Sequence, residues 1–396
     1  MIYLDHNATT PVDPRVLEVM LPYFTEIYGN AASNDHEMGL MAKRAVDKAR
    51  EQIATLINAR PEEIIFTSGA TESDNIALFG VAQRYANKGD HIITVVTEHK
   101  AILDCGQRLE KMGKRVTYLP VDQQGMVDPD AVRQAITPQT ILISVMAANN
   151  EIGTLAPLAE IGRIAREHGV LFHTDAAQAV GHGPIDVQAM NIDLLSLSAH
   201  KVYGPKGIGA LYRRRSNPSV LLEPVIYGGG HERGIRSGTL NVPGIVGLGE
   251  ALRIAKIEMA AEDARFRRWT EEMWQRFQAE VGDVQRNGHP TCGLPHTLNV
   301  SFPGVESRGL IVKLKDVAIA TGSACTSAKT EPSHVIQALG FGDERAHTAL
   351  RISVGRFNID AEIQEAVDRI VDAIRQLRRF SIPHNDKLTS VHISRI

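Results

Sequence analysis

Short apolar runs rich in β-branched residues alternate with stretches of helical periodicity through the middle of this chain. Such alternation predicts strand–helix–strand crossovers, which build a mostly parallel sheet with helices on both of its faces. We therefore expect an α/β fold. The expected strands are residues 64–67, 91–96, 116–121, 141–147, 170–175, 194–199 and 209–213. The expected helices between them are residues 72–85, 100–112, 129–136 and 157–168.

The pattern changes after a long helical stretch at residues 244–281. A chain of 396 residues exceeds one typical domain, so two domains are expected. We predict a large α/β domain at residues 15–258 and a smaller α+β domain made of residues 1–14 and 259–396. The expected elements outside the sheet region are helices at 15–24, 41–56, 306–314, 332–339 and 360–379, and strands at 297–302, 317–321 and 351–354.

Composition argues against several classes of protein. With 43 Lys and Arg against 46 Asp and Glu, the net charge of −3 provides no basic field for nucleic acid or a membrane surface. Apolar runs stay below the roughly 18 residues that a membrane span needs, and no signal-peptide pattern is visible. Three widely spaced cysteines, Cys105, Cys292 and Cys325, argue against a disulfide framework or a metal site. We expect a soluble, cytoplasmic protein without a bound metal.

Polar residues follow four of the expected strands at the point where each strand ends. The sequences SGATES, TEHK, ANNEIG and DAAQ come after the strands at 64–67, 91–96, 141–147 and 170–175. In a parallel sheet the carboxyl ends of the strands lie at one edge, and ligands bind beyond that edge. The sequence therefore predicts a functional site at this edge.

Lys201 follows the strand at 194–199, close to Ser198 and His200 and just before a glycine-rich turn. A neutral lysine amine can form a Schiff base, and burial or neighbouring cations lower the pKa of a lysine enough to favour that form. The alternative is a solvated loop cation, which is the usual state of a lysine. Other residues at the same edge decide between the two.

Residues 69–73, which include Ala70 and Thr71, lie between an expected strand and an expected helix. The first turn of such a helix offers free backbone N–H groups and the positive end of its dipole, which together suit a phosphate group. Thr71 can equally be an ordinary helix cap with nothing bound. Ser198 and His200 can complete a phosphate site from the neighbouring strand end.

Four further side chains at this edge suit a planar cofactor. Asp175 can pair with a protonated ring nitrogen, or it can cap a helix. Gln178 can hydrogen-bond a ring hydroxyl, and His99 can stack on a ring and move a proton or can be structural. Asn150 can contact cofactor or substrate, or only fix a turn. Together with the phosphate site and Lys201, these groups describe pyridoxal 5′-phosphate (PLP).

Eight runs of the sequence resemble those of the cysteine desulfurases of the NifS/IscS type, which are class-V aminotransferase-like enzymes of PLP fold type I. The resemblance extends from about residue 2 to residue 378. The runs are LDHNATTP, FTSGATES, TEHKAIL, NNEIGT, DAAQAVG, SAHKVYGPKGIGALY, GGGHERGIRSGTLNV and TGSACTS.

The resemblance implies a role for each residue of the PLP site. Lys201 would carry the cofactor, His99 would stack on its ring, Asp175 would face the ring nitrogen and Gln178 the phenolic oxygen. Thr239 would reach the phosphate bound by a partner subunit, which implies a homodimer with shared active sites. The expected cofactor-binding residues are Ala70, Thr71, His99, Asn150, Asp175, Gln178, Ser198, His200, Lys201 and Thr239.

Cys325 lies in GSACTS, a run of small residues that leaves its thiol uncrowded. Its surroundings favour a nucleophile, whereas Cys105 and Cys292 suit structural positions. The GSACTS form resembles the desulfurase class with a mobile catalytic loop. Arg351 can clamp a substrate carboxylate, and the resemblance places the substrate-binding arginine at this position. Asn150 is the second expected substrate-binding residue.

The resemblance implies removal of sulfur from L-cysteine, which gives L-alanine and a persulfide on Cys325. Lys201 and His99 are the other expected catalytic residues. A sulfur-acceptor protein would then receive the sulfur for iron–sulfur cluster assembly, thiolation or DNA phosphorothioation. A selenocysteine lyase or an aminotransferase on the same scaffold remains the alternative.

Overall fold

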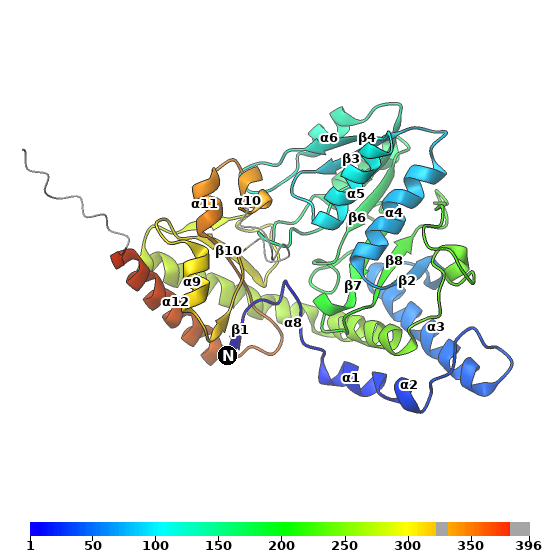
Figure 1. Ribbon diagram of the computed structural model, residues 1–396, viewed down its shortest axis with the longest axis horizontal. Coiled ribbons are helices and arrows are strands. Elements are labelled where there is room, and N and C mark those ends of the chain that lie inside the picture. Colours follow the sequence, from blue (N-terminus) through cyan, green and yellow to red (C-terminus); the bar gives the residue numbers. More distant parts are fainter. Residues whose placement is uncertain (322–331, 381–396) are drawn as a thin grey trace, which may run out of the picture.

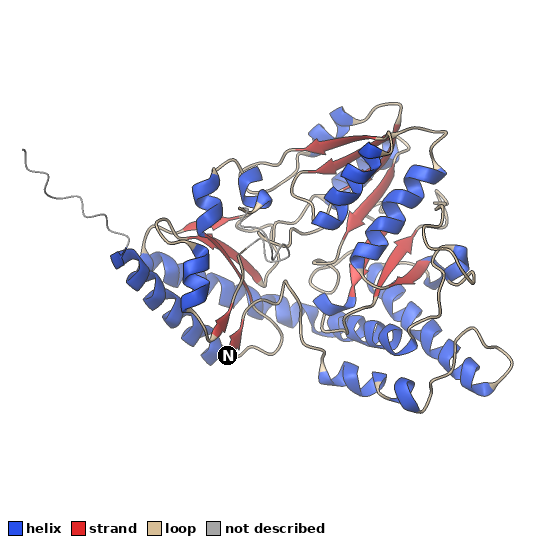
Figure 2. Cartoon of the chain, in the orientation of Figure 1, coloured by secondary structure: helices blue, strands red, loops and turns tan. Residues whose placement is uncertain are grey.

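A seven-stranded sheet forms the centre of the larger part of the molecule (Figures 1 and 2). The structure, a computed structural model, describes residues 1–321 and 332–380. All strand pairs are parallel except the two made by β8, so the predicted mostly parallel α/β sheet is confirmed. In spatial order the strands are β2 (Ile64–Thr67), β8 (Gly209–Arg213), β7 (Leu194–Ser198), β6 (Leu171–Asp175), β5 (Thr140–Ser144), β3 (His91–Val95) and β4 (Arg115–Leu119).

Apolar side chains cover both faces of this sheet, because successive residues of a strand point to opposite sides. Leu142 and Leu171 pack on one face against α4 (Ala70–Arg84) and α5 (Lys100–Lys111). Their chain neighbours Ile143 and Phe172 belong to the core of the opposite face. The helices of that face are α3 (Glu37–Ile57), α6 (Pro129–Ala135), α7 (Leu158–Glu167) and the first half of α8 (Val242–Val281).

The long helix α8 contributes to two separate cores. Its first half joins the sheet core through residues such as Leu252, whereas Phe266 and Phe277 in its second half pack with the C-terminal elements. This arrangement is visible in Figure 1, where α8 extends from the elements around the seven-stranded sheet to the C-terminal elements. The exact domain boundaries stay a prediction.

A three-stranded antiparallel sheet and a short parallel pair lie beside the second half of α8. The sheet has the order β12 (Ala349–Ser353), β10 (Thr297–Ser301) and β9 (Gln285–Asn287), and the pair is β1 (Ile2–Tyr3) with β11 (Val317–Ala318). The helices of this part are α9 (Ser307–Lys313), α10 (His334–Ala338), α11 (Asp343–Thr348) and α12 (Asp360–Phe380).

Two expected elements differ from the structure, and two short elements were not expected. The helix expected at 15–24 is divided into α1 (Pro14–Met20) and α2 (Pro22–Thr25), because Pro22 has no N–H with which to continue a helix. The strand expected at 317–321 is reduced to the two residues of β11. The short, polar elements β9 and α11 were not expected, since their sequences show no apolar periodicity.

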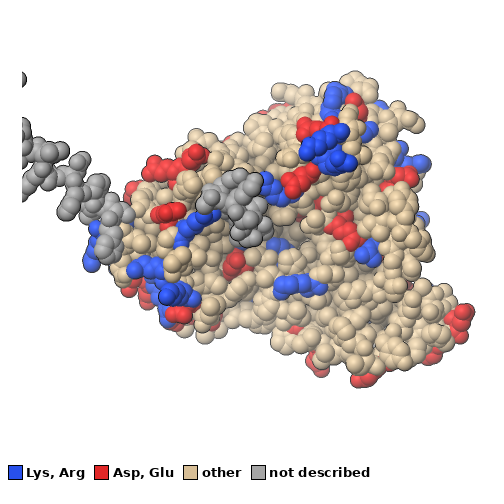
Figure 3. Space-filling view, in the orientation of Figure 1, with Lys and Arg blue, Asp and Glu red and all other residues tan. Residues whose placement is uncertain are grey.

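Charged side chains of both signs are interspersed on the face shown in Figure 3. Within residues 1–321 and 332–380, no helix is both long and apolar enough to cross a membrane.

Candidate active site

A cavity of about 510 Å³ lies at the carboxyl ends of the parallel strands. Its walls bring together side chains that are far apart in the chain, from Asn7 to Arg351. Residues from the N-terminal arm, Asn7 to Thr9, close one side of it. The expected site residues that line the cavity are Ala70, Thr71, His99, Asn150, Asp175, Gln178, Ser198, His200, Lys201 and Arg351.

Two expected site residues are not among them. Thr239 lies in a loop that precedes α8, and its side chain is exposed to solvent. Cys325 lies outside the described residues.

Lys201 points its amine toward the N-terminal arm. It is the last residue of a single 3-10 turn, Ala199–Lys201, which directly follows β7. Its Nζ atom donates to the carbonyl oxygen of Ala8 at 3.0 Å and also to that of Asn7. A nitrogen of the His182 ring lies 2.9 Å from the Lys201 carbonyl oxygen and fixes the main chain at this point. The amine is therefore held inside the cavity by backbone carbonyl groups, which a bound molecule can replace.

Asp175 supplies a buried negative charge at the end of β6. It is 6% exposed, and its Oδ1 atom accepts a hydrogen bond from Ala177 N–H at 2.9 Å. Burial raises the pKa of Asp175 because a low-dielectric environment disfavours the charged form. A cation bound beside this carboxylate would stabilise the ionised form. A protonated ring nitrogen fits this position.

Asp74, on the buried face of α4, lies behind this part of the cavity wall. Burial and the neighbouring charge of Asp175 both raise the pKa of Asp74 well above its ordinary value. The Nε2 atom of His173 is 3.6 Å from Asp74 Oδ1, and burial lowers the pKa of His173 to about 3. These shifts favour the neutral forms of Asp74 and His173. Of the two neighbouring carboxyl groups, Asp175 is therefore the one that carries the negative charge.

The N-terminus of α4 forms the part of the cavity that suits an anion. Gly69 caps the helix with φ 157° and ψ 179°, a conformation that is essentially restricted to glycine. A Cβ atom added to Gly69 would lie 3.8 Å from the Ser198 hydroxyl, so the two strand ends meet here. Ala70 and Thr71 begin the helix, where backbone N–H groups and the helix dipole attract negative charge.

His200 and Lys206 also line this part of the cavity. Burial and the nearby lysines lower the pKa of His200 to about 4, so its imidazole is neutral near pH 7. A neutral imidazole can donate one hydrogen bond to a phosphate oxygen without a cost in charge burial. Its Nδ1 atom lies 3.2 Å from the Thr9 hydroxyl.

Arg351, which belongs to β12, also lines the cavity. It is 2% exposed, and its guanidinium donates to Asn150 O at 2.9 Å and to the Asp5 carboxylate at 2.7 Å. Its buried Nε has no hydrogen-bond partner within the part of the chain that the structure describes. A guanidinium with a spare donor and a carboxylate partner is able to bind a second carboxylate.

His99 and Gln178 are fixed by contacts with neighbouring backbone. His99 precedes α5, and its Nδ1 accepts from Ala101 N–H at 3.2 Å. Gln178 donates to the Asn7 carbonyl at 3.0 Å.

The cavity also contains Asn7, Ala8 and Thr9 of the N-terminal arm and Asp74, which were not predicted from the sequence as site residues. The only available signal for Asp74 was a polar residue in a helix with a weakly amphipathic pattern.

The cavity as a whole fits PLP. It presents an amine for a Schiff base, a buried carboxylate for the ring nitrogen and a helix N-terminus for the phosphate. Arg351 remains for the carboxylate of an amino-acid substrate.

Comparisons with known proteins agree with this geometry. Residues 2–366 match the model of the family described as aminotransferase class-V. A cysteine desulfurase IscS from Anaeromyxobacter dehalogenans is 53% identical over 380 residues, which cover 96% of this chain and 94% of that protein. The solved structure of a NifS-like protein has a TM-score of 0.88 at 37% identity and covers 95% of this chain and 99% of its own.

A second solved structure, SspA in complex with cysteine, has a TM-score of 0.79 at 39% identity and covers 91% of this chain and 100% of its own. These similarities extend over nearly the full length and include the elements that build the cavity. The chain therefore belongs to the aminotransferase class-V family and, within it, to the PLP-dependent cysteine desulfurases of the IscS type.

Proposed function

We propose that Lys201, His99 and Cys325 are the catalytic residues of this cysteine desulfurase and that L-cysteine is its substrate. The single observation that supports the proposal most is the convergence of ten expected site residues on one cavity. Relatives with about half of their residues identical bear the name cysteine desulfurase, which favours this activity over the selenocysteine lyase or aminotransferase alternative.

Bound PLP supplies an electron sink for the bond changes at the amino-acid Cα and Cβ atoms. Asp175 favours a protonated ring nitrogen, because a buried carboxylate gains most from an adjacent positive charge. Lys201 would hold the cofactor through its amine, and this amine would take the Cα proton of the substrate and return it to Cα after the sulfur has left. Thr71, Ser198 and His200 would hold the phosphate, and Ala70 begins the first turn of α4, which would face it.

Arg351 binds the substrate carboxylate in the way in which it binds the Asp5 carboxylate. Asn150 lies next to it, because the Asn150 carbonyl accepts from the same guanidinium. A substrate bound there would place its amino group and Cα toward Lys201. Gln178 and His99 border the same space.

Sulfur leaves the substrate by attack of the Cys325 thiolate on the substrate sulfur. An S–S bond forms and the Cβ–S bond breaks, and the electron pair of that bond stays with the substrate carbon, which takes up a proton. One L-cysteine and one Cys325 thiol thus give one L-alanine and one Cys325 persulfide. An acceptor protein takes the sulfur for iron–sulfur cluster assembly, thiolation or DNA phosphorothioation.

The protein would act as a cytoplasmic homodimer, with Thr239 of each subunit reaching the phosphate bound by the other. The exposure of Thr239 supports this role. Exposed apolar side chains on and beside α1 and α2, namely Leu17, Leu21, Phe24 and Tyr28, offer a surface that a second copy can cover. The widely spaced cysteines support a reducing compartment.

The test compares substrates with purified protein loaded with PLP. L-cysteine should yield alanine and, without a reductant, bound sulfur, whereas the lyase alternative predicts alanine from L-selenocysteine and little from L-cysteine. The aminotransferase alternative predicts that a 2-oxo acid acceptor is consumed and that L-cysteine gives no alanine. Either of these last results would overturn the proposal.

A further inference from the structure

Tyr203, two residues after Lys201, has a main-chain conformation that a tyrosine rarely adopts. Its φ angle is 64°, in the left-handed region, and its side chain is 1% exposed. A residue with a bulky side chain keeps such a conformation only where surrounding contacts impose it. The contacts that impose it here therefore also determine the path of the chain at Lys201.

The N-terminal arm holds the main chain on both sides of Lys201. Thr10 donates to the His200 carbonyl through its N–H and through its hydroxyl, each at 2.9 Å. The same hydroxyl accepts from Tyr203 N–H at 2.8 Å, and Asp13 N–H donates to the Tyr203 carbonyl at 3.0 Å. These bonds leave little freedom for the two residues between His200 and Tyr203, the first of which is Lys201.

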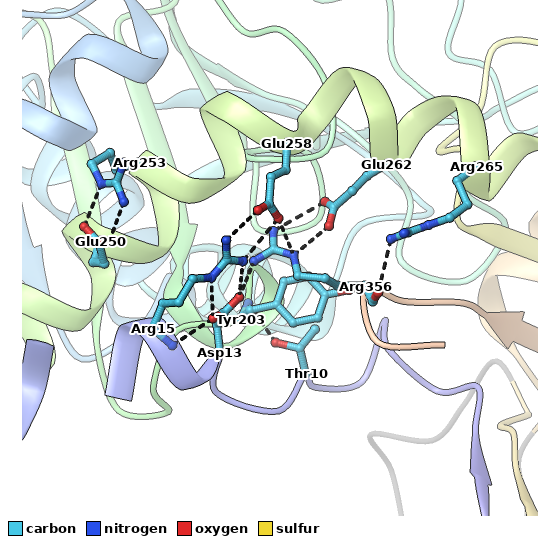
Figure 4. Close-up of polar contacts among 10 residues, drawn as sticks. All are labelled: Thr10, Asp13, Arg15, Tyr203, Glu250, Arg253, Glu258, Glu262, Arg265 and Arg356. Atoms are coloured by element: carbon cyan, nitrogen blue, oxygen red, sulfur yellow. Dashed lines mark hydrogen bonds and ion pairs between the residues drawn. The ribbon is translucent and has the colours of Figure 1, made fainter. Parts of the chain in front are cut away.

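The Tyr203 side chain packs against an ion cluster, which comprises Arg15, Arg356, Asp13, Glu258 and Glu262 (Figure 4). The Tyr203 hydroxyl accepts a hydrogen bond from the main-chain N–H of Arg356 at 2.6 Å. The Arg356 guanidinium lies 4.2 Å from the centre of the Tyr203 ring. That guanidinium is 2.9 Å from Asp13, 2.6 Å from Glu262 and 3.3 Å from Glu258. Three carboxylates surround the Arg356 guanidinium, whose side chain is 5% exposed. They balance its buried charge and fix its position.

The ion cluster joins three parts of the chain at this point. Asp13 comes from the N-terminal arm, Glu258 and Glu262 come from α8, and Arg356 follows β12 by three residues. The strand β12 also carries Arg351 of the cavity. The arrangement therefore connects the lysine segment to the strand that faces the substrate position.

We propose that Tyr203 and Arg356 are positioning residues for Lys201: the ion cluster holds the Tyr203 turn, and this turn sets the direction of the lysine amine in the cavity. The inference rests on the proposed role of Lys201 and goes beyond it. Neither Tyr203 nor Arg356 is among the residues that line the cavity, so both act through Lys201.

The test uses the full chain with Tyr203→Phe, which removes one oxygen atom and leaves the Arg356 N–H without its acceptor. Arg356→Met and Arg356→Lys form a second pair, in which lysine keeps the charge. Glu250→Gln is the matched control, since Glu250 lies on α8 and pairs with Arg253 at 2.6 Å, apart from the ion cluster (Figure 4).

Four quantities are measured: the melting temperature without cofactor, the dissociation constant for PLP, the pH midpoint of the absorbance change of bound PLP, and kcat and KM for L-cysteine. We expect Tyr203→Phe to weaken PLP binding about fivefold, as for the loss of one net hydrogen bond. The pH midpoint should move by about half a unit, because the proton affinity of the lysine–cofactor linkage depends on its geometry. The kcat value should fall more than KM rises, and Arg356→Lys should recover part of what Arg356→Met loses.

The inference is overturned if Tyr203→Phe keeps the wild-type midpoint, PLP affinity and kcat, even where the melting temperature falls. It is also overturned if Glu250→Gln shifts the midpoint equally. Should Arg356→Met fail to fold, Tyr203→Phe alone decides. Failure of the proposed function would be seen in the wild-type protein itself. There the cofactor would be linked to a lysine other than Lys201, and none of these variants is needed to detect that.

Discussion

Replacement of Asp175 by asparagine should have opposite effects on the protein without cofactor and on its affinity for PLP. Asparagine has the shape of aspartate, and its Oδ1 atom can still accept the hydrogen bond from Ala177 N–H that Asp175 accepts at 2.9 Å. The substitution therefore removes mainly the buried charge. In the cofactor-free protein burial makes that charge unfavourable despite the nearby His99 and Lys201, whereas a protonated ring nitrogen beside it would make it favourable.

The sign of the effect on stability follows from the direction in which burial moves the pKa of Asp175. Burial raises the pKa of Asp175 in the folded state above the unfolded value of about 3.9. Below the unfolded pKa the carboxyl is protonated in both states and has no such cost; the cost grows as pH rises and is complete above the folded pKa. A buried polar group without a full set of partners costs about 1 to 3 kcal/mol, and more when it is charged, so Asp175→Asn should raise the free energy of unfolding by roughly 1 to 3 kcal/mol at pH 7.

The affinity for PLP should move the other way, by about 100-fold or more, because the variant loses a buried charge pair. The assay is denaturant unfolding of the cofactor-free forms between pH 5 and 8, together with equilibrium dialysis against PLP. Glu63→Gln is the matched control: Glu63 is buried as well, but hydrogen bonds from Arg60 and Arg215 outweigh the effect of burial and lower its pKa, so its neutralisation should destabilise the fold by about 1 to 3 kcal/mol. A cofactor-free Asp175→Asn variant that is less stable than wild type at pH 7, with unchanged PLP affinity, would refute the reasoning.

Three further results are expected. Lys201→Ala should abolish the covalent linkage of PLP, and peptide mapping of wild type after borohydride reduction should find the label on Lys201; a label on Lys206 would contradict the assignment. Arg351→Lys should raise KM for L-cysteine about 30-fold with a smaller change in kcat, because lysine cannot form a bidentate pair with a carboxylate; steady-state kinetics with an unchanged KM would exclude the role. Glu232→Gln should lower the free energy of unfolding by about 3 to 5 kcal/mol, since Glu232 accepts from Arg50 at 2.7 and 2.9 Å inside the protein; a loss below 1 kcal/mol in denaturant unfolding would contradict this.

The sheet and the position of the cavity can be predicted from the sequence, because both follow from local patterns of apolar and polar residues. Apolar runs determine where the strands of a parallel sheet end, and ligands bind beyond those ends. Asp175, Ser198 and Lys201 can therefore be assigned to one site from their places in the sequence alone. Their roles in catalysis and cofactor binding remain predictions.

Contacts between distant segments cannot be predicted from local sequence patterns. The arm residues Asn7 and Ala8 meet Lys201 across more than 190 positions, and Tyr203 meets Arg356 across 153. No local periodicity records such a contact, because it depends on how two cores pack along α8. Asp74 was missed for a related reason, since a polar residue in a helix is usually assigned to the solvent face.

The most direct test of the central claim is a single-turnover reaction of the PLP-loaded protein with L-cysteine, in the absence of a reductant. Alanine is quantified, and the peptide that contains Cys325 is analysed by mass spectrometry. The account predicts one alanine for each Cys325 that gains the mass of one sulfur atom, and no alanine from Cys325→Ala, although that variant retains the absorbance of bound PLP. Alanine formation by Cys325→Ala at the wild-type rate would contradict it.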